Sequence, residues 1–356
     1  MRVTHYARRS LAAAVLALAV AACGKDNNAP SEFNPQGTSA DMAAAQGAFV
    51  SAPAQSFAAV GADISTVLGG SPAVASSATL AMTRPSAASV RYARQLASLV
   101  RADRGGIQAS AAAVPASYLG ATFVWDETTH GYVQSDLAGA PSNGVRFLLY
   151  AVDPVTLQVV EPAVEVGYVD IIDQSTSSSV NFRVKVVEGS VVYLDYSVVA
   201  SGGTSSALVT VSGFASNGTT LANFTLKNTF SQNAGGLVLS FDYDLNVPSR
   251  GVSLNWTATF ANISDTEVVV TLDLGISGPN GQVRLVGTYG ANGGSFSVKV
   301  NGDLFATVTQ SAQGQVVTGA SGQPLTPDEE ATLHDIMNYY EVSLLAFSEL
   351  ILPLGA

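Results

Sequence analysis

The sequence is poor in several features that usually point to a function. It contains one cysteine in 356 residues, which excludes an intramolecular disulfide framework and a metal site built from several cysteines. Only 12% of the residues are charged, and 27 acids against 16 bases give a net charge of −11. An acidic chain of this kind argues against a nucleic-acid partner, because phosphate groups require a basic surface. The apolar fraction of 47% excludes a disordered chain.

Motifs that carry catalytic chemistry are also missing. We find no G-x-S-x-G elbow, P-loop, H-E-x-x-H or dinucleotide-binding fingerprint. His130 stands in a predicted turn and His334 lies off the apolar stripe of a predicted helix, so we expect both to be exposed. The acidic run at 242–246 resembles the start of a calcium loop, but it lacks the loop glycine and the distal glutamate. The sequence therefore predicts no metal site, no cofactor and no enzymatic activity, with a hydrolase acting through one of these histidines as an alternative.

The first 23 residues have the pattern of a secretion signal. Arg2, Arg8 and Arg9 precede an unbroken apolar run of twelve residues at 11–22, which is too short for a permanent membrane-spanning helix of about 20 residues. The run ends in Val20-Ala21-Ala22-Cys23. This ending resembles the lipobox of bacterial lipoproteins, in which small residues precede the cysteine that becomes the mature N-terminus.

The resemblance implies that residues 1–22 are a signal peptide and that Cys23 carries a diacylglyceryl thioether and an N-acyl chain. Several acyl chains anchor a soluble domain stably where one is marginal. Gly24 stands where an aspartate would signal retention in the inner membrane, so the resemblance places the protein in the bacterial cell envelope, at the outer membrane. Removal of the signal peptide would change the net charge to −14. Residues 23–40 are rich in Pro, Gly and Asn and predict a lipidated flexible tether.

Residues 41–118 are rich in alanine and serine, and we predict a helical region here. Apolar residues recur at helical spacing between 57 and 68, and a second helix is predicted over 86–103. Four arginines at and just before this helix are spaced 7, 3 and 7 residues apart, which is the spacing of one helical face and suggests contact with anionic lipid headgroups; the alternative is a solvated face on a helix packed against the domain. These arginines are Arg84, Arg91, Arg94 and Arg101.

From 119 to 325 the pattern predicts an antiparallel β domain. Apolar and polar residues alternate with a period of two, most clearly over 237–300, which places one apolar and one wet face on a sheet. The segments are divided by hairpin signals such as Asn217-Gly218, Asn280-Gly281 and Asn301-Gly302. No helix-length segment intervenes, and several predicted strands have ten or more residues. We therefore expect a large curved meander, either a half-barrel or a sandwich-like arrangement.

Residues 326–356 predict a C-terminal amphipathic helix that packs on the β domain. Thr326 and Glu329 form a capping box, with Pro327 at the first helical position. One apolar stripe follows and must be buried, and the apolar face of the sheet is its expected partner. The stripe consists of Leu333, Ile336, Met337, Tyr340, Leu344, Phe347 and Ile351.

This combination of signal, curved sheet and covering helices is similar in layout to lipoprotein carriers and receptors of the LolA/LolB type. The resemblance covers layout only, because no diagnostic motif of that family is present. It implies an envelope lipoprotein that binds an apolar ligand such as a lipid, or a protein partner, through its β scaffold. The alternatives are a structural or adhesive surface lipoprotein without a ligand, and an outer-membrane β-barrel, whose alternating strands have a similar pattern.

Overall fold

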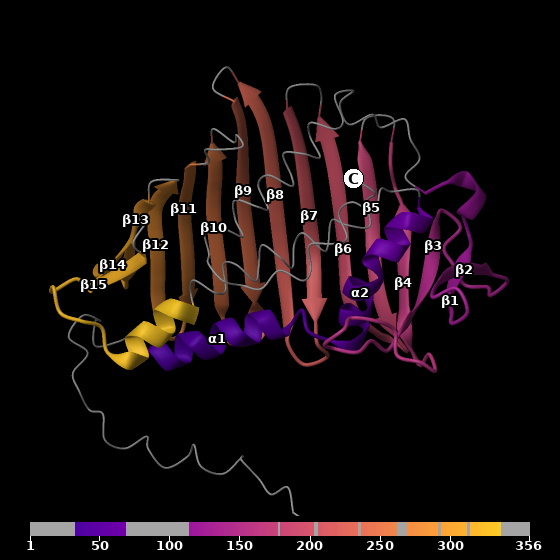
Figure 1. The fold of residues 1–356 in the computed structure, drawn as a ribbon, viewed down its shortest axis with the longest axis horizontal. Coiled ribbons are helices and arrows are strands. Elements are labelled where there is room, and N and C mark those ends of the chain that lie inside the picture. Colours follow the sequence, from indigo (N-terminus) through magenta and orange to yellow (C-terminus); the bar gives the residue numbers. More distant parts are fainter. Residues whose placement is uncertain are drawn as a thin grey trace, which may run out of the picture.

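The fold is dominated by a single large antiparallel sheet (Figure 1). The structure is a computed structural model and describes residues 33–68, 114–176, 179–202, 206–233, 236–261, 269–290, 293–311 and 314–335. Its strands are β1 (Thr122–Asp126), β2 (Gly131–Ser135), β3 (Gly144–Tyr150), β4 (Glu165–Asp173), β5 (Val180–Glu188), β6 (Val191–Gly202), β7 (Ser206–Ser216), β8 (Leu221–Asn233), β9 (Gly236–Val247), β10 (Val252–Ala261), β11 (Val269–Gly278), β12 (Gly281–Gly290), β13 (Gly293–Val300), β14 (Asp303–Ser311) and β15 (Gly314–Gly319).

The strand order confirms the predicted meander over most of its length. From β3 to β15 each strand pairs with its neighbours in sequence, and all of these pairs are antiparallel. The exception is at the start, where β1 pairs with β2 as a hairpin and also pairs in parallel with β3. The sheet is not closed, and β2 and β15 form its two edges. All described strands belong to this one open sheet, which confirms the predicted mainly β meander.

Tight turns follow the glycine signals of the sequence. Asn301 and Gly302 join β13 to β14, and both have positive φ, of 50° and 95°. A two-residue hairpin turn of this kind requires positive φ at both central positions, which asparagine and glycine tolerate. Gly218 lies between β7 and β8 and also has positive φ. Between β9 and β10 the chain forms a short 3-10 turn, η3 (Pro248–Arg250), and another, η2 (Ala116–Tyr118), precedes β1.

The two faces of the sheet differ as the alternation predicts. One face, here called the inner face, carries buried apolar side chains from every long strand, and they belong to one continuous core. On β9, for example, Phe241 and Tyr243 are buried, whereas Asp242 and Asp244 between them are exposed on the outer face. Burial of this apolar surface is the main force that holds the sheet in place.

Two helices precede the sheet in sequence. The first is α1 (Pro35–Gly47) and the second is α2 (Ala52–Val67). Helix α2 contacts β2 to β6, running obliquely across the sheet in Figure 1, and it buries Phe57, Val60 and Ile64, as the helical spacing predicts. Its buried Ser56 accepts a hydrogen bond (3.1 Å) from the backbone N–H of Tyr150, where an irregularity interrupts the β3–β4 register.

Helix α1 corrects the predicted tether. Residues 23–40 were expected to be flexible, but the helix begins at Pro35. The Asn34 side chain caps it by accepting a hydrogen bond from the N–H of Gly37 (2.9 Å), and Pro35 occupies the first helical position, where it loses no helical hydrogen bond. The polar residues of this stretch were interpreted as a flexible tether, although Asn34 and Pro35 are typical residues for the start of a helix. The remainder of the predicted tether, 23–32, lies outside the described residues.

The C-terminal helix is described from residue 327 to 335. Its predicted capping box is confirmed, because Thr326 N–H donates to Glu329 Oε2 (2.6 Å) and Glu329 N–H donates to Thr326 Oγ1 (3.3 Å). Leu333 of the apolar stripe is buried. The Asp328 side chain accepts a hydrogen bond (2.7 Å) from Gln36, which ties the start of this helix to the start of α1. The other stripe residues lie outside the described part of the chain.

Candidate functional site

The site residues predicted from the sequence are not among the described residues. Cys23 and the signal peptide precede residue 33, and the four arginines Arg84, Arg91, Arg94 and Arg101 lie in the gap between 68 and 114. Their proposed roles in lipidation and in membrane contact stay predictions. The described helices include none that is long and apolar enough to cross a membrane.

Both histidines of the described chain are exposed, as predicted. His130 lies in the turn between β1 and β2 with φ 48°, and its Nδ1 is 2.8 Å from a carboxylate oxygen of the exposed Glu161. His334 is on the exposed side of the C-terminal helix. The acidic run at 242–246 is part of β9, and its acids line the outer face. In the described residues no three His, Cys, Asp or Glu side chains gather closely enough to hold a metal ion.

The outer face is polar and is crossed by rows of aligned side chains. One row holds a hydroxyl on each of seven consecutive strands, β8 to β14, in direct register. Its members are Thr229, Ser240, Thr259, Thr271, Thr288, Ser295 and Thr309. Cross-strand threonine and serine pairs favour sheet pairing, and two of these hydroxyls lie 3.3 Å apart. This row therefore stabilises a solvated face.

Three arginine–aspartate pairs also join neighbouring strands, and they differ in exposure. Arg146 on β3 forms two hydrogen bonds to Asp170 on β4 (2.7 and 2.8 Å), and its guanidinium lies 3.7 Å from the centre of the Tyr168 ring. The hydrogen bond to Asp170 raises the pKa of Arg146. The pair Arg284–Asp273, between β12 and β11, is more open, with the arginine side chain 61% exposed. The third pair is Arg183–Asp195.

The inner face carries the chemistry that stands out from this polar scaffold. Its centre, on β8 to β10, is a cluster of aromatic rings. The Trp256 ring centre lies 5.9 Å from that of Phe241 and 5.5 Å from that of Tyr243, and the Phe241 and Phe260 rings meet edge to face at 5.3 Å. On β6, burial raises the pKa of Tyr196 well above its ordinary value, so this phenol stays neutral. The cluster presents a broad apolar surface without a charge.

One polar residue interrupts this apolar surface. Asn228 on β8 is completely buried, with Leu226 and Phe230 on either side along its strand and Phe241 opposite on β9. Neither its amide nitrogen nor its carbonyl oxygen has a hydrogen-bond partner in the described protein. A buried amide without a partner costs about 1–3 kcal/mol by mutational measures. At this inner-face position a leucine would fit the alternation of apolar and polar residues and would stabilise the fold more than Asn228 does. A residue that costs stability in this way indicates a functional role.

A second group of titratable residues lies where α2 meets the start of the sheet. The Tyr132 hydroxyl donates a hydrogen bond (2.7 Å) to the backbone carbonyl of Leu148, and burial raises the pKa of this tyrosine strongly. Burial also raises the pKa of the half-buried Asp63 of α2 and of Tyr150. Among the described residues, the serine in hydrogen-bond contact with this group is Ser56, whose hydroxyl accepts from the backbone N–H of Tyr150, and no histidine or second carboxylate is hydrogen-bonded to the group. It therefore forms no recognisable catalytic arrangement.

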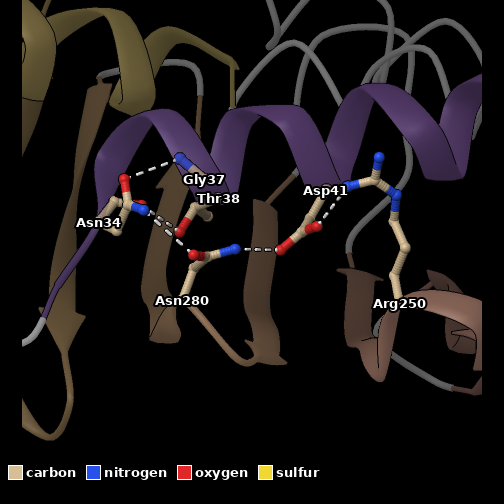
Figure 2. Close-up of polar contacts among 6 residues, drawn as sticks. All are labelled: Asn34, Gly37, Thr38, Asp41, Arg250 and Asn280. Carbon is tan, nitrogen blue, oxygen red and sulfur yellow. Dashed lines mark hydrogen bonds and ion pairs between the residues drawn. The ribbon is translucent and has the colours of Figure 1, made fainter.

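A polar network fixes α1 to the hairpin turns at one end of the sheet (Figure 2). Asn34 donates from its side chain to Asn280 Oδ1 (3.2 Å), in the turn between β11 and β12. Asp41, only 6% exposed, accepts from Asn280 Nδ2 (2.7 Å) and from Arg250 Nη1 (2.9 Å), which belongs to η3 between β9 and β10. At the end of the helix, the Gly47 carbonyl accepts from the side chain of the next turn, at Asn217 (2.9 Å). We call these contacts the α1 clasp.

Geometry explains why one helix can reach three turns. Successive hairpins on one end of a meander are two strands apart, or about 9.6 Å. The clasp residues Asn34, Asp41 and Gly47 are seven and six residues apart, which at about 1.5 Å per residue is roughly 9–10.5 Å along a helix. The rise of α1 therefore matches the spacing of the turns, and the clasp bonds fall at consecutive hairpins. Sequence reasoning did not predict this arrangement.

Comparison with known protein families, with curated proteins and with solved structures found no match in any of the three. The similarity in layout to carriers of the LolA/LolB type thus stays a prediction from the sequence.

Proposed function

We propose that this protein is a lipid-anchored lipoprotein of the bacterial envelope, and that the inner face of its sheet binds an apolar ligand carrying one polar group. The amide of Asn228 carries this proposal, because it is a fully buried donor and acceptor without a hydrogen-bond partner among the described residues, at the edge of an aromatic cluster. Ligand sites are typically apolar surfaces with a few placed polar groups that fix orientation.

The amide chemistry narrows the class of ligand. Its nitrogen donates two hydrogen bonds and its oxygen accepts, so a hydroxyl or an amide in the ligand would satisfy both atoms at once. Acyl chains or rings of the ligand would lie on the surrounding apolar side chains. The described inner face has no charged side chain that could pair with a charged headgroup. A lipid with a hydroxyl or amide near its acyl chain has this combination of groups.

The anchor part of the proposal depends on Cys23 and on the place where the chain enters the domain. Phe33, the first described residue, is buried and lies ten positions after Cys23. Fully extended, such a segment spans about 33–36 Å. In the anchored protein, the sheet end that carries the α1 clasp would therefore be held within roughly that distance of the membrane surface.

The ligand proposal is tested by native mass spectrometry of the full-length chain with Cys23→Ser, followed by organic extraction and lipid identification. The wild-type inner face should retain a stoichiometric lipid. Asn228→Leu should lower the occupancy, because the leucine cannot hydrogen-bond the ligand. Asn223→Leu is the matched control, since Asn223 lies on the same strand but is exposed on the outer face.

The same variants separate a binding role from a structural one. With its ligand removed, Asn228→Leu should be more stable than the parent by about 1–3 kcal/mol, because an unpaired buried amide is replaced by an apolar group. A protein that retains no lipid under any condition would refute ligand binding and favour the structural or adhesive lipoprotein. Equal lipid occupancy in the Asn228→Leu and Asn223→Leu variants would refute the role of Asn228.

The anchor is tested separately by metabolic labelling with palmitate. Cys23→Ala in the otherwise intact chain should abolish labelling and release the protein from the membrane fraction. Labelling that persists in this variant would refute lipidation at Cys23, and it would leave the ligand proposal standing on its own experiment.

A further inference from the structure

The last strand of the sheet is an open edge. Strand β15 pairs with β14 on one side and ends the strand order, at the left of the sheet in Figure 1. The side chains of its central residues, 315–318, are all exposed. Val316 is 61% exposed on the outer face, and Val317 is 36% exposed on the opposite face.

The hydrogen-bond pattern shows which backbone groups of β15 are free. Just beyond the strand, the N–H of Ala320 donates to the carbonyl of Phe305 on β14 (2.9 Å). In an antiparallel pair the bonded residues alternate, so the even-numbered residues of β15 point their N–H and C=O toward β14. The N–H and C=O groups of Gln315 and Val317 therefore point outward, and nothing in the described residues pairs with them.

This edge lacks the usual protection against pairing. Edge strands are commonly blunted by charged residues, proline or a bulge. Strand β15 has none of these in GQVVTG, and the whole stretch 304–327 contains no charged residue. The opposite edge, β2, is different, because Asp126, Glu127 and Asp136 flank it. In a chain of net charge −11, the edge at β15 is therefore where a second acidic molecule meets least repulsion.

We propose that β15 pairs antiparallel with β15 of a second copy of this chain, with Val316 on the two-fold axis. In this register Gln315 of each copy faces Val317 of the other, and their outward N–H and C=O groups form four backbone hydrogen bonds. The two Val316 side chains then face each other in a non-hydrogen-bonded pair, in which Cα atoms lie about 4.5 Å apart. The most exposed apolar side chain of the strand is buried by its own copy.

Symmetry and charge favour this partner over the other edge. Pairing of β15 with β2 would be head to tail and would leave both outer edges free to extend into a fibre, whereas the two-fold pair closes. It would also bring the acids that flank β2 into contact with a second acidic chain. Because a strand pair of this length buries less than the roughly 1,200 Å² of stable complexes, the dimer is weak and reversible.

Cysteine cross-linking tests the register directly. In the full-length Cys23→Ser chain, Val316→Cys supplies the only thiol, and its Cα spacing in the proposed dimer suits a disulfide. Val317→Cys is the matched control, because the two copies of residue 317 are diagonal neighbours about 7–8 Å apart. Under mild oxidation at high protein concentration, the dimer yield from Val316→Cys should exceed that from Val317→Cys by about tenfold.

Each other outcome would overturn the proposal. Equal yields from the two variants, or no cross-linked dimer from Val316→Cys, would exclude the proposed register. A mixture of Val316→Cys with Val133→Cys, on the β2 edge, should give almost no mixed disulfide; a mixed product that dominates would replace the two-fold pair with head-to-tail assembly. Gln315→Pro, which removes an outward N–H and spares the bonds to β14, should lower the Val316→Cys yield, and an unchanged yield would refute backbone pairing.

Discussion

The α1 clasp should be sensitive to a single added methyl group at Gly37. Gly37 lies in the first turn of α1, directly over the Asn280 side chain (Figure 2). A Cβ atom at this position would overlap the Asn280 amide and would come 2.7 Å from the Asn34 amide nitrogen. Gly37→Ala should therefore push Asn280 out of its place between Asn34 and Asp41.

The magnitude follows from two opposing effects. Glycine to alanine in a helix normally stabilises by up to about 1 kcal/mol. Displacement of Asn280 loses its bond to the buried Asp41 carboxylate, worth about 1.5–3 kcal/mol as a charged hydrogen bond, and its neutral bond to Asn34, worth about 0.5–1.5 kcal/mol. The losses exceed the gain, so we expect a net destabilisation of about 2 kcal/mol.

Thermal unfolding followed by circular dichroism measures this effect. On the scale of a 150–250-residue domain, about 2 kcal/mol lowers Tm by roughly 4–8 °C. Gly61→Ala in α2 is the matched control, because a Cβ there meets no atom within 4 Å, and it should raise stability by about 0.5–1 kcal/mol. In an Asn280→Ala background the overlap with Asn280 is gone and the Asn34 amide has lost its partner there, so Gly37→Ala should destabilise much less than it does in the parent. If Gly37→Ala stabilises the parent as much as Gly61→Ala does, the clasp contributes nothing and the reasoning is refuted.

Two further predictions concern charged groups. Arg146→Lys should destabilise by about 1–2 kcal/mol, because lysine loses both the bidentate hydrogen bond to Asp170 and the stacking on Tyr168. Arg284→Lys at the exposed pair should change the free energy of unfolding much less, and equal effects of the two substitutions in chemical denaturation would contradict this reasoning. Burial raises the pKa of Asp63, so the folded protein holds this proton more tightly and loses stability as the pH rises from below 3.8 through the raised value. Asp63→Asn should therefore raise Tm near neutral pH, with a gain that vanishes toward about pH 3, and a gain independent of pH would show that ionisation is not its cause.

The strand pattern could be predicted because it depends on local chemistry. On β9 and β10 every second residue is apolar, and a slip of one residue in their register would move Phe241 or Trp256 to the wet face. The turn at Asn301-Gly302 and the capping box at Thr326 depend on residues within four positions of each other, so sequence alone identifies them. The order of the strands in the sheet could also be predicted, because short connections place strands that are consecutive in sequence side by side.

Features that depend on distant partners were missed. Helix α1 has no clear apolar stripe, and polar bonds to turns more than 200 residues away hold its Asn34 and Asp41. The parallel pairing of β1 with β3 also depends on the folded sheet rather than on either segment. Asn228 is visible in the sequence as a polar residue that interrupts the apolar positions Leu226 and Phe230 of its strand. The sequence does not show, however, that this side chain is buried or that it has no hydrogen-bond partner among the described residues.

The position of the clasp suggests how an anchored protein of this shape resists pulling. An open sheet that was tethered through one edge strand would transmit force to a single ladder of hydrogen bonds, which could peel apart bond by bond. Here the chain that follows the predicted anchor enters α1, and α1 is bonded to three hairpin turns spaced along the sheet end. A force on Cys23 would reach the sheet through α1, and α1 would distribute it over the bonds to these three turns. In the proposed lipoprotein, an anchor at Cys23 and a helix matched to the hairpin spacing would together connect the membrane to the six strands that these turns join.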